Sequence, residues 1–190
     1  MLTVADARSR IMKAMLKTTS IEVSVSEVFG RVLAEELKSR RTQPPFDVSA
    51  MDGFAVRARD VSSVPATLKV VGTVHAGGSY SQILNSGEAV RIFTGAPVPM
   101  GADTIVIQED TTALGDSVIV KGIEPERHIR SAGLDFSEGD VLLKPGQLLT
   151  ARDAGLIAAM NIPWVMVRQK PRVGILSTGD EIVMPGDTLV

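Results

Sequence analysis

The sequence predicts an α+β, multidomain protein in which an all-β domain is inserted into a discontinuous α/β domain. Helix-like patterns occur near both ends of the chain, whereas the middle contains short β-rich runs separated by Gly, Pro, Asn or Asp clusters, as in all-β modules. A short apolar run close to the end predicts the first strand of a further, truncated α/β domain. The expected boundaries are 1–43 and 130–170 for the discontinuous domain, 44–129 for the inserted one and 171–190 for the truncated one.

Composition bounds the class of protein. The 190 residues are 44% hydrophobic and 22% charged, with a formal net charge of −2 and no cysteine, which is close to the average of folded soluble proteins. The charge gives no indication of a nucleic-acid or membrane partner, and the lack of cysteine excludes disulfides and thiolate metal sites. With no signal-like start and no long apolar run, we expect a soluble, cytoplasmic protein.

The first 43 residues predict two helices with a strand between them. The run Thr3-Val4-Ala5-Asp6 resembles a capping box and precedes apolar residues at helical spacing. Residues 21–25 alternate like a short strand. A second capping box at residues 24–27 predicts a helix that continues to about residue 37, although Gly30 within it costs about 1 kcal/mol relative to Ala.

Residues 44–56 form the junction between the helical start and the β-rich middle. Two prolines there favour extended backbone, and Asp47 and Asp52 can bond neighbouring backbone groups of an ordered loop. Gly53 permits a positive φ or a close backbone approach. From the residues alone, solvated loop acids remain the plainer interpretation of this stretch.

The β-rich middle contains four expected strands. They cover residues 67–74, 89–93, 104–108 and 117–122, and turn-forming clusters separate them. The spacing predicts a compact β domain.

After residue 130 the helical pattern returns. Residues 141–143 predict a short strand, and a third capping box at 150–153 opens a helix for which Asn161 is the expected stop. Residues 162–167 predict the next strand.

The last stretch predicts a strand without its domain. Residues 173–176 are apolar and run into the hydroxyl-rich, acidic loop 177–181, and open α/β sheets bind ligands at such strand ends. Because neither a helix nor a second strand follows, we expect the chain to be a fragment.

Several loops concentrate the polar and Gly-rich residues, yet each is weak by itself. Thr94-Gly95 follows a strand, so its hydroxyl and amides can face an anion, but it is also an ordinary turn. The loops contain no P-loop or dinucleotide fingerprint. His75 and His128 lack metal-ligand spacing and are read as ordinary surface or turn residues.

Taken in order, the motifs closely resemble one family. They are Pro45-Phe46-Asp47-Val48-Ser49-Ala50-Met51-Asp52-Gly53-Phe54-Ala55, Thr94-Gly95-Ala96-Pro97-Val98-Pro99-Met100-Gly101-Ala102-Asp103, Ile129-Arg130 with Gly133 and Asp135, and Ser177-Thr178-Gly179-Asp180-Glu181. The family is that of molybdopterin molybdenumtransferases, which includes MoeA and the gephyrin E domain. The resemblance covers the N-terminal portion of such proteins and runs from about Val4.

The resemblance implies an elongated homodimer with a discontinuous linker domain, an inserted β domain and a molybdopterin-binding α/β domain, of which this chain holds only the first strand. It also implies insertion of molybdenum from molybdate into adenylylated molybdopterin, with release of AMP and with Mg²⁺ as cofactor. The molybdopterin adenylyltransferase is an expected partner, whereas nucleic acid and membranes are not. We expect the chain alone to be inactive.

The family's functional positions carry over by motif. The catalytic candidates are Asp52, Thr94, Asp135 and Glu181; the cofactor-binding candidates are Arg130, Ser177, Thr178 and Gly179; the metal candidates are Asp52 and Glu181. Ser131-Ala132 replaces the more basic residues often present after the arginine, which weakens any expectation of local positive charge.

Two other functions stay open at this point. A non-catalytic scaffold or binding module of the gephyrin E-domain type would use the same architecture without needing the acids. A sugar- or phosphate-binding β module beside a truncated Rossmann-like domain leaves the Ser-Ala-Met-Asp-Gly run unexplained.

Overall fold

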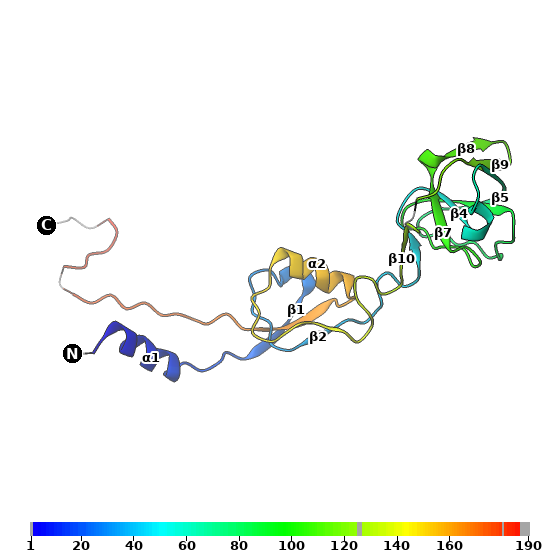
Figure 1. Ribbon diagram of the computed structural model, residues 1–190. Helices are drawn as coiled ribbons and strands as arrows, with labels where there is room; N and C mark the ends of the chain where they lie inside the picture. The colour runs from blue at the N-terminus through cyan, green and yellow to red at the C-terminus, as the bar shows by residue number, and fades with distance from the viewer. Residues whose placement is uncertain (1, 125–126, 180, 187–190) are drawn as a thin grey trace.

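The computed structural model describes residues 2–124, 127–179 and 181–186. It contains two folded bodies joined by a narrow connection (Figure 1). We call residues 20–43 and 131–168 the two-part lobe, and residues 44–124 and 127–130 the sheet lobe. The N-terminal helix and the C-terminal segment both extend from the two-part lobe, away from the sheet lobe.

Two pairs of strands from opposite ends of the sequence tie the two-part lobe together. β1 (Ser20–Ser24) pairs antiparallel with β12 (Trp164–Arg168). β2 (Leu37–Lys38) pairs antiparallel with β11 (Val141–Leu143), with a register shift inside the pair. The predicted strands at 21–25, 141–143 and 162–167 are confirmed within one or two residues at their ends.

Helix α2 (Ala151–Ala159) covers this lobe and starts at the predicted capping box. Thr150 accepts from the Asp153 backbone N–H while the Asp153 carboxylate accepts from the Thr150 backbone N–H. Asn161, the predicted stop, has φ +63°. The core of the lobe consists of Val23, Val28, Leu33, Leu37, Phe136, Leu143, Leu149, Ile157, Met160, Ile162, Val165 and Val167.

The helix predicted to run from the second capping box to residue 37 does not form. Only the 3₁₀ turn η1 (Val25–Glu27) is helical there, and the chain then turns at Gly30, which has φ +71°. After the turn the backbone hydrogen-bonds to segments that are distant in sequence; the Leu33 N–H, for example, donates to the Gln147 carbonyl at 2.9 Å. Distant partners therefore replace the helical ladder, while Val28, Leu33 and Leu37 are still buried.

Helix α1 (Val4–Ala14) forms where predicted, and Thr3 caps it by accepting from the Asp6 N–H. None of its residues is buried, so its apolar side chains contact no core in the described part of the chain. None of the helices in the described residues is long and apolar enough to cross a membrane.

The sheet lobe is built on one curled, six-stranded sheet. Its spatial order is β7 (Thr104–Ile107), β4 (Gly53–Val56), β6 (Glu88–Ile92), β5 (Ala66–Val74), β9 (Ser117–Val120) and β8 (Thr111–Leu114). Neighbours are antiparallel except β5 and β6, which are parallel. The four predicted strands are confirmed, and β4 and β8 were not predicted.

Strand β4 is buried on both faces of the sheet. Phe54 and Val56 pack into one apolar cluster, and Ala55 between them packs into another. A Cβ on Gly53 would lie 2.0 Å from the Val106 carbonyl oxygen. Gly53 is thus required by close backbone approach, one of the two uses that its sequence context allowed.

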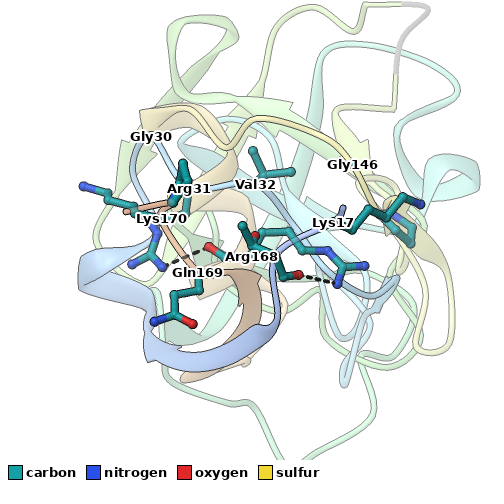
Figure 2. Close-up of a pocket in the computed structure, with 11 residues that line it drawn as sticks. Lys17, Gly30, Arg31, Val32, Gly146, Arg168, Gln169 and Lys170 are labelled. Carbon is teal, nitrogen blue, oxygen red and sulfur yellow. Dashed lines mark hydrogen bonds between the residues drawn. The ribbon is translucent and has the colours of Figure 1, made fainter. Parts of the chain in front are cut away.

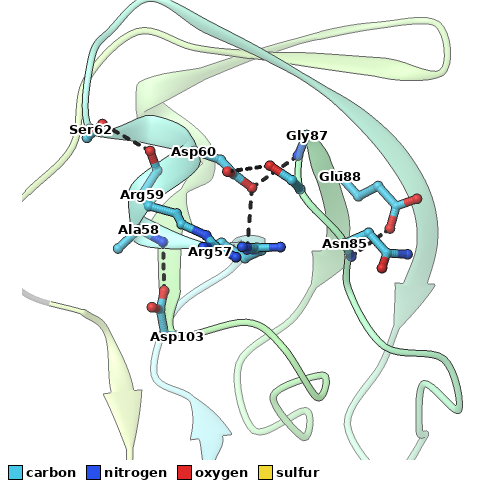
Figure 3. Close-up of polar contacts among 10 residues, drawn as sticks. Arg57, Ala58, Arg59, Asp60, Ser62, Asn85, Gly87, Glu88 and Asp103 are labelled. Carbon is cyan, nitrogen blue, oxygen red and sulfur yellow. Dashed lines mark hydrogen bonds and ion pairs between the residues drawn. The ribbon is translucent and has the colours of Figure 1, made fainter.

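A polar network fastens the 3₁₀ turn η2 (Ala58–Val61) to a neighbouring loop (Figure 3). The Asp60 carboxylate accepts from the Ser86 hydroxyl at 2.8 Å and from the Gly87 N–H at 3.0 Å. The Arg57 guanidinium lies 3.7 Å from the same carboxylate. This largely buried acid therefore accepts two hydrogen bonds from the loop and forms an ion pair with Arg57.

The connection between the lobes is itself a strand pair. β3 (Val48–Ser49) pairs antiparallel with β10 (Ile129–Arg130), and a bridge between Gln43 and Phe136 continues the contact. Because β3 and β10 are paired, the chain enters and leaves the sheet lobe through adjacent segments. Elsewhere in the sheet lobe, a further 3₁₀ turn, η3 (Gln108–Asp110), follows β7.

The strand predicted at residues 173–176 is not present. Within the described residues this segment pairs with no other strand, and Val173, Ile175 and Leu176 are 78–90% exposed. A strand needs a ladder partner for its backbone groups, and an apolar run alone does not supply one.

Candidate functional site

Asp52 and Thr94 meet at the ends of two paired strands. Asp52 directly precedes β4 and Thr94 follows β6, and the antiparallel register places Gly53 opposite Ile92. The Thr94 backbone N–H and hydroxyl both donate to Asp52 Oδ1, each at 2.8 Å. Within the described residues the other carboxylate oxygen accepts no hydrogen bond.

These contacts hold Asp52 in its ionised form. The Thr94 N–H, followed by the Thr94 hydroxyl, lowers the pKa of Asp52; partial burial opposes them with a smaller effect, and the Arg91 guanidinium adds the smallest lowering. Hydrogen bonds to a carboxylate favour the charged state. Asp52 therefore presents a fixed negative charge beside the Thr94 turn at neutral pH.

An arginine side chain and three aromatic rings are stacked next to this pair. The Arg91 guanidinium carbon lies 4.7 Å from the Phe93 ring centroid and 5.2 Å from that of Phe54. Arg91 also donates to the Gly53 carbonyl at 2.9 Å, and His75 stacks on Phe93 with centroids 4.7 Å apart. Sequence reasoning did not select these residues, because only the pairing of β4 with β6 shows that Arg91 and Phe93 lie beside Asp52.

A cavity of about 380 Å³ lies where the connection meets the sheet lobe. Gly95, the neighbour of Thr94, lines it together with Arg130 and Asp135. In the described part of the chain, neither the Arg130 guanidinium nor the Asp135 carboxylate has a hydrogen-bond or ion-pair partner. The structure therefore brings the second and third predicted motifs to one cavity with a free cation and a free acid.

Asp47 has a different environment from Asp52. Its carboxylate accepts from the Ala132 N–H at 2.8 Å, and its carbonyl accepts from the Val98 N–H at 2.9 Å. Both contacts link segments that are far apart in sequence. Asp47 thus helps to hold the connection between the lobes.

The fourth motif lies far from the other three. Ser177, Thr178, Gly179 and Glu181 are exposed and belong to the extended C-terminal segment, at the opposite end of the molecule from the sheet lobe (Figure 1). A turn forms there, in which the Ile182 N–H donates to the Gly179 carbonyl at 3.1 Å; Asp180 lies outside the described residues. Within this chain Glu181 does not approach Asp52.

The acids of the described residues do not assemble a metal site by themselves. Nowhere in residues 2–124, 127–179 and 181–186 do three or more His, Asp or Glu side chains gather to hold a metal ion. Asp52 still offers one free carboxylate oxygen. A hard cation bound there would need further oxygen ligands from water or from a phosphate-bearing substrate.

The comparison with known proteins agrees with the order of the motifs. A family model described as the MoeA N-terminal region (domain I and II) matches residues 2–161. The molybdopterin molybdenumtransferase of Haemophilus influenzae is 38% identical over 192 residues, covering 100% of this chain and 47% of the relative. That of Nostoc is 40% identical over 159 residues, covering 81% and 36%.

Solved structures give the same result. The crystal structure of a molybdopterin biosynthesis MoeA protein from Pyrococcus horikoshii OT3 matches with a TM-score of 0.81 and 34% identity, over 87% of this chain and 45% of that chain. The chain spans about half the length of the curated relatives that match all of it. On these matches, the chain belongs to the family of the MoeA N-terminal region.

Proposed function

We propose that this chain is the N-terminal part of an enzyme of molybdenum cofactor biosynthesis. In this proposal the complete protein inserts molybdenum from molybdate into adenylylated molybdopterin and releases AMP. The relatives' name, molybdopterin molybdenumtransferase, supports the reaction class. The observation that carries the proposal for this chain is the Asp52–Thr94 pair, an ionised acid held by two hydrogen bonds next to Gly95, which lines the cavity of Arg130 and Asp135.

Each polar group has a role in the proposal that suits its chemistry. Molybdate is a dianion and the adenylylated pterin carries a pyrophosphate, so Arg130 would bind oxyanions. The backbone N–H groups of Thr94, Gly95 and Ala96 already donate within the chain and are not free for this role. Asp52 cannot attract an anion directly. Its free oxygen would instead bind Mg²⁺, which accepts carboxylate oxygen and bridges phosphates, and Asp135 would orient water or substrate in the same cavity.

The separation of the motifs supports a shared site. Glu181 and the hydroxyls of the fourth motif lie at the far end of the chain from Asp52, so one copy does not supply both halves. In a homodimer, Asp52 and Thr94 of one protomer would serve the segment that contains Glu181 in its partner. The proposal also includes a cytoplasmic location and delivery of the substrate by the molybdopterin adenylyltransferase.

The test is the isosteric change Asp52→Asn in the complete protein. Asparagine retains an oxygen that accepts from Thr94, so the fold is kept while the charge is lost. We expect a slower rate of molybdenum insertion into adenylylated molybdopterin and a shift of the Mg²⁺ dependence to higher concentration. Asp116→Asn, at an exposed turn remote from Asp52, is the matched control and should leave both unchanged.

A wild-type rate with an unchanged Mg²⁺ requirement in Asp52→Asn would refute the role of Asp52. Residues 1–190 alone are expected to be inactive, and detectable metal insertion by them would contradict that expectation.

A further inference from the structure

The two-part lobe contains a second cavity of about 450 Å³ that the proposed reaction does not use (Figure 2). It lies where the segment before β1, the turn after η1 and the segment after β12 come together. The lining residues with polar or charged side chains are Lys17, Thr18, Arg31, Arg168, Gln169 and Lys170. The cavity that contains Arg130 lies at the other end of this lobe, at the junction with the sheet lobe.

The charge of this cavity is of one sign. Lys17, Arg31, Arg168 and Lys170 line it, and no acidic side chain among the described residues does. The whole chain has a net charge of −2, so four cations around one cavity are a local concentration rather than a general excess. An adjoining cavity of about 400 Å³ shares Lys17 and Lys170 and adds Arg172.

Backbone carbonyls hold the two guanidinium groups in place. Arg31 Nη2 donates to the Arg168 carbonyl at 3.1 Å, and Arg168 Nη1 donates to the Thr18 carbonyl at 3.2 Å. Figure 2 shows Arg31 and Lys170 on one side of the cavity and the Arg168 guanidinium with Lys17 on the other. The cations are therefore distributed around the space, and both arginines keep N–H donors that form no hydrogen bond within the described residues.

One of these donors is buried without a partner. Arg31 Nε is inaccessible to solvent and, in the described part of the chain, forms no hydrogen bond. A donor that solvent cannot reach is also closed to a ligand in the cavity, so the donors that Arg31 offers to an anion are those on its Nη atoms. Charge-assisted bonds of this kind are the stronger class of protein hydrogen bonds.

The size and the remaining walls indicate the kind of anion. Ligand cavities of small organic molecules typically measure about 300–1,000 Å³, so the space exceeds what one phosphate ion needs. Val32, Pro145 and Pro171 provide apolar wall beside the cations. Such a cavity suits a phosphate ester with an organic body, whose phosphates contact the cations while the body lies against the apolar wall.

We propose that this cavity binds a small phosphorylated organic anion of nucleotide size, at a site separate from the one that contains Asp52. The inference rests only on the residues of the two-part lobe and on the segments beside it. It holds or fails independently of the reaction proposed above.

The experiment measures ADP binding to the complete protein by calorimetry and locates the nucleotide by photolabelling with 8-azido-ADP and peptide mapping. The test variant is Lys17→Gln with Lys170→Gln, because both side chains are exposed and form no hydrogen bond in the described residues. The control is Lys69→Gln with Lys121→Gln, an equal charge change on exposed positions of the sheet lobe. We expect label on the peptides that contain residues 17–32 and 145–171.

Each result bears on the proposal. The test variant should weaken ADP binding about tenfold or more at this site and remove the label, while the control pair keeps both. Equal effects of the two pairs, or label confined to peptides near Asp52, would overturn it. Pyrophosphate binding as tight as that of ADP would overturn the role of the apolar wall. If another segment of the complete protein fills the cavity, its residues will carry no label, and that result would overturn the site.

Discussion

Gly53 is the first residue of the buried strand β4 and directly follows Asp52, and among the glycines of the described residues it is the one at which an added Cβ would meet the closest atom. Gly53→Ala would place a Cβ 2.0 Å from the Val106 carbonyl oxygen and 2.9 Å from its carbonyl carbon, whereas real Cβ contacts below 3.0 Å essentially do not occur. The obstructing atoms are backbone atoms, so no rotamer change can relieve the contact. Relief requires β4 and β7 to separate by about 1 Å.

The energy of that separation can be worked out from the ladder. Gly53 pairs with Ile107, and Phe54 pairs with Val106, so moving the strands apart weakens about two hydrogen bonds, each worth about 1 kcal/mol net. Overpacking of a well-filled region adds about 1–3 kcal/mol. We therefore expect Gly53→Ala to lower the free energy of unfolding by about 3–5 kcal/mol.

The assay is urea unfolding followed by circular dichroism, with hydrogen exchange to locate the loss. Exchange should accelerate first at the amides of β4 and β7. Gly155→Ala is the matched control, because Gly155 lies in α2 with no atom within 4 Å of an added Cβ. It should stabilise the protein by about 0.5–1 kcal/mol. An unfolding midpoint of Gly53→Ala equal to that of the wild type would refute the close-approach argument.

Three further changes test the hydrogen bonds of single acids. Thr94→Val should raise the pKa of Asp52 in a ¹³C NMR titration, and an unchanged pKa would contradict this assignment. Because the pKa of Asp52 is lowered in the folded state, the stability from this contact is present above the unfolded pKa of about 3.9. It is lost as the pH falls through the folded pKa. Thr150→Ala should cost about 1 kcal/mol in denaturant unfolding at neutral pH, with no loss at all arguing against the capping box. Asp60→Ala should cost about 3 kcal/mol by the same measurement, since it leaves an arginine and a loop amide without their acceptor; a cost below about 0.5 kcal/mol would mean that water replaces the carboxylate.

Local signals in the sequence were sufficient where the structure is local. The N-cap at Thr3, the capping box at Thr150 and the stop at Asn161 depend on residues a few positions apart, and all three form, although at Thr3 only the side-chain half of the expected box is present. The same kind of signal was wrong at residues 24–37, because Gly30 turns the chain and the backbone bonds to segments more than a hundred residues away.

The site shows a similar limit. The motif resemblance selected Asp52 and Thr94, but the sequence could not show that one carboxylate oxygen takes both Thr94 donors while the other stays free. Arg91 and His75 were not selected, because their positions beside Asp52 depend on strand register and on a ring stack. Nor did the apolar run before Ser177 identify a strand, since the ladder partner of a strand is not encoded in the run itself.

The strand pair β3 and β10 has a consequence for how the cavity beside Arg130 behaves. Val48 and Arg130 are opposite one another in this pair, and both line the cavity, as does Gly95 from the body of the sheet lobe. A change in the angle of the connection would therefore change the shape of the cavity. A molecule bound in the cavity would restrict bending of the connection, and the angle between the lobes would therefore differ between the filled and the empty cavity.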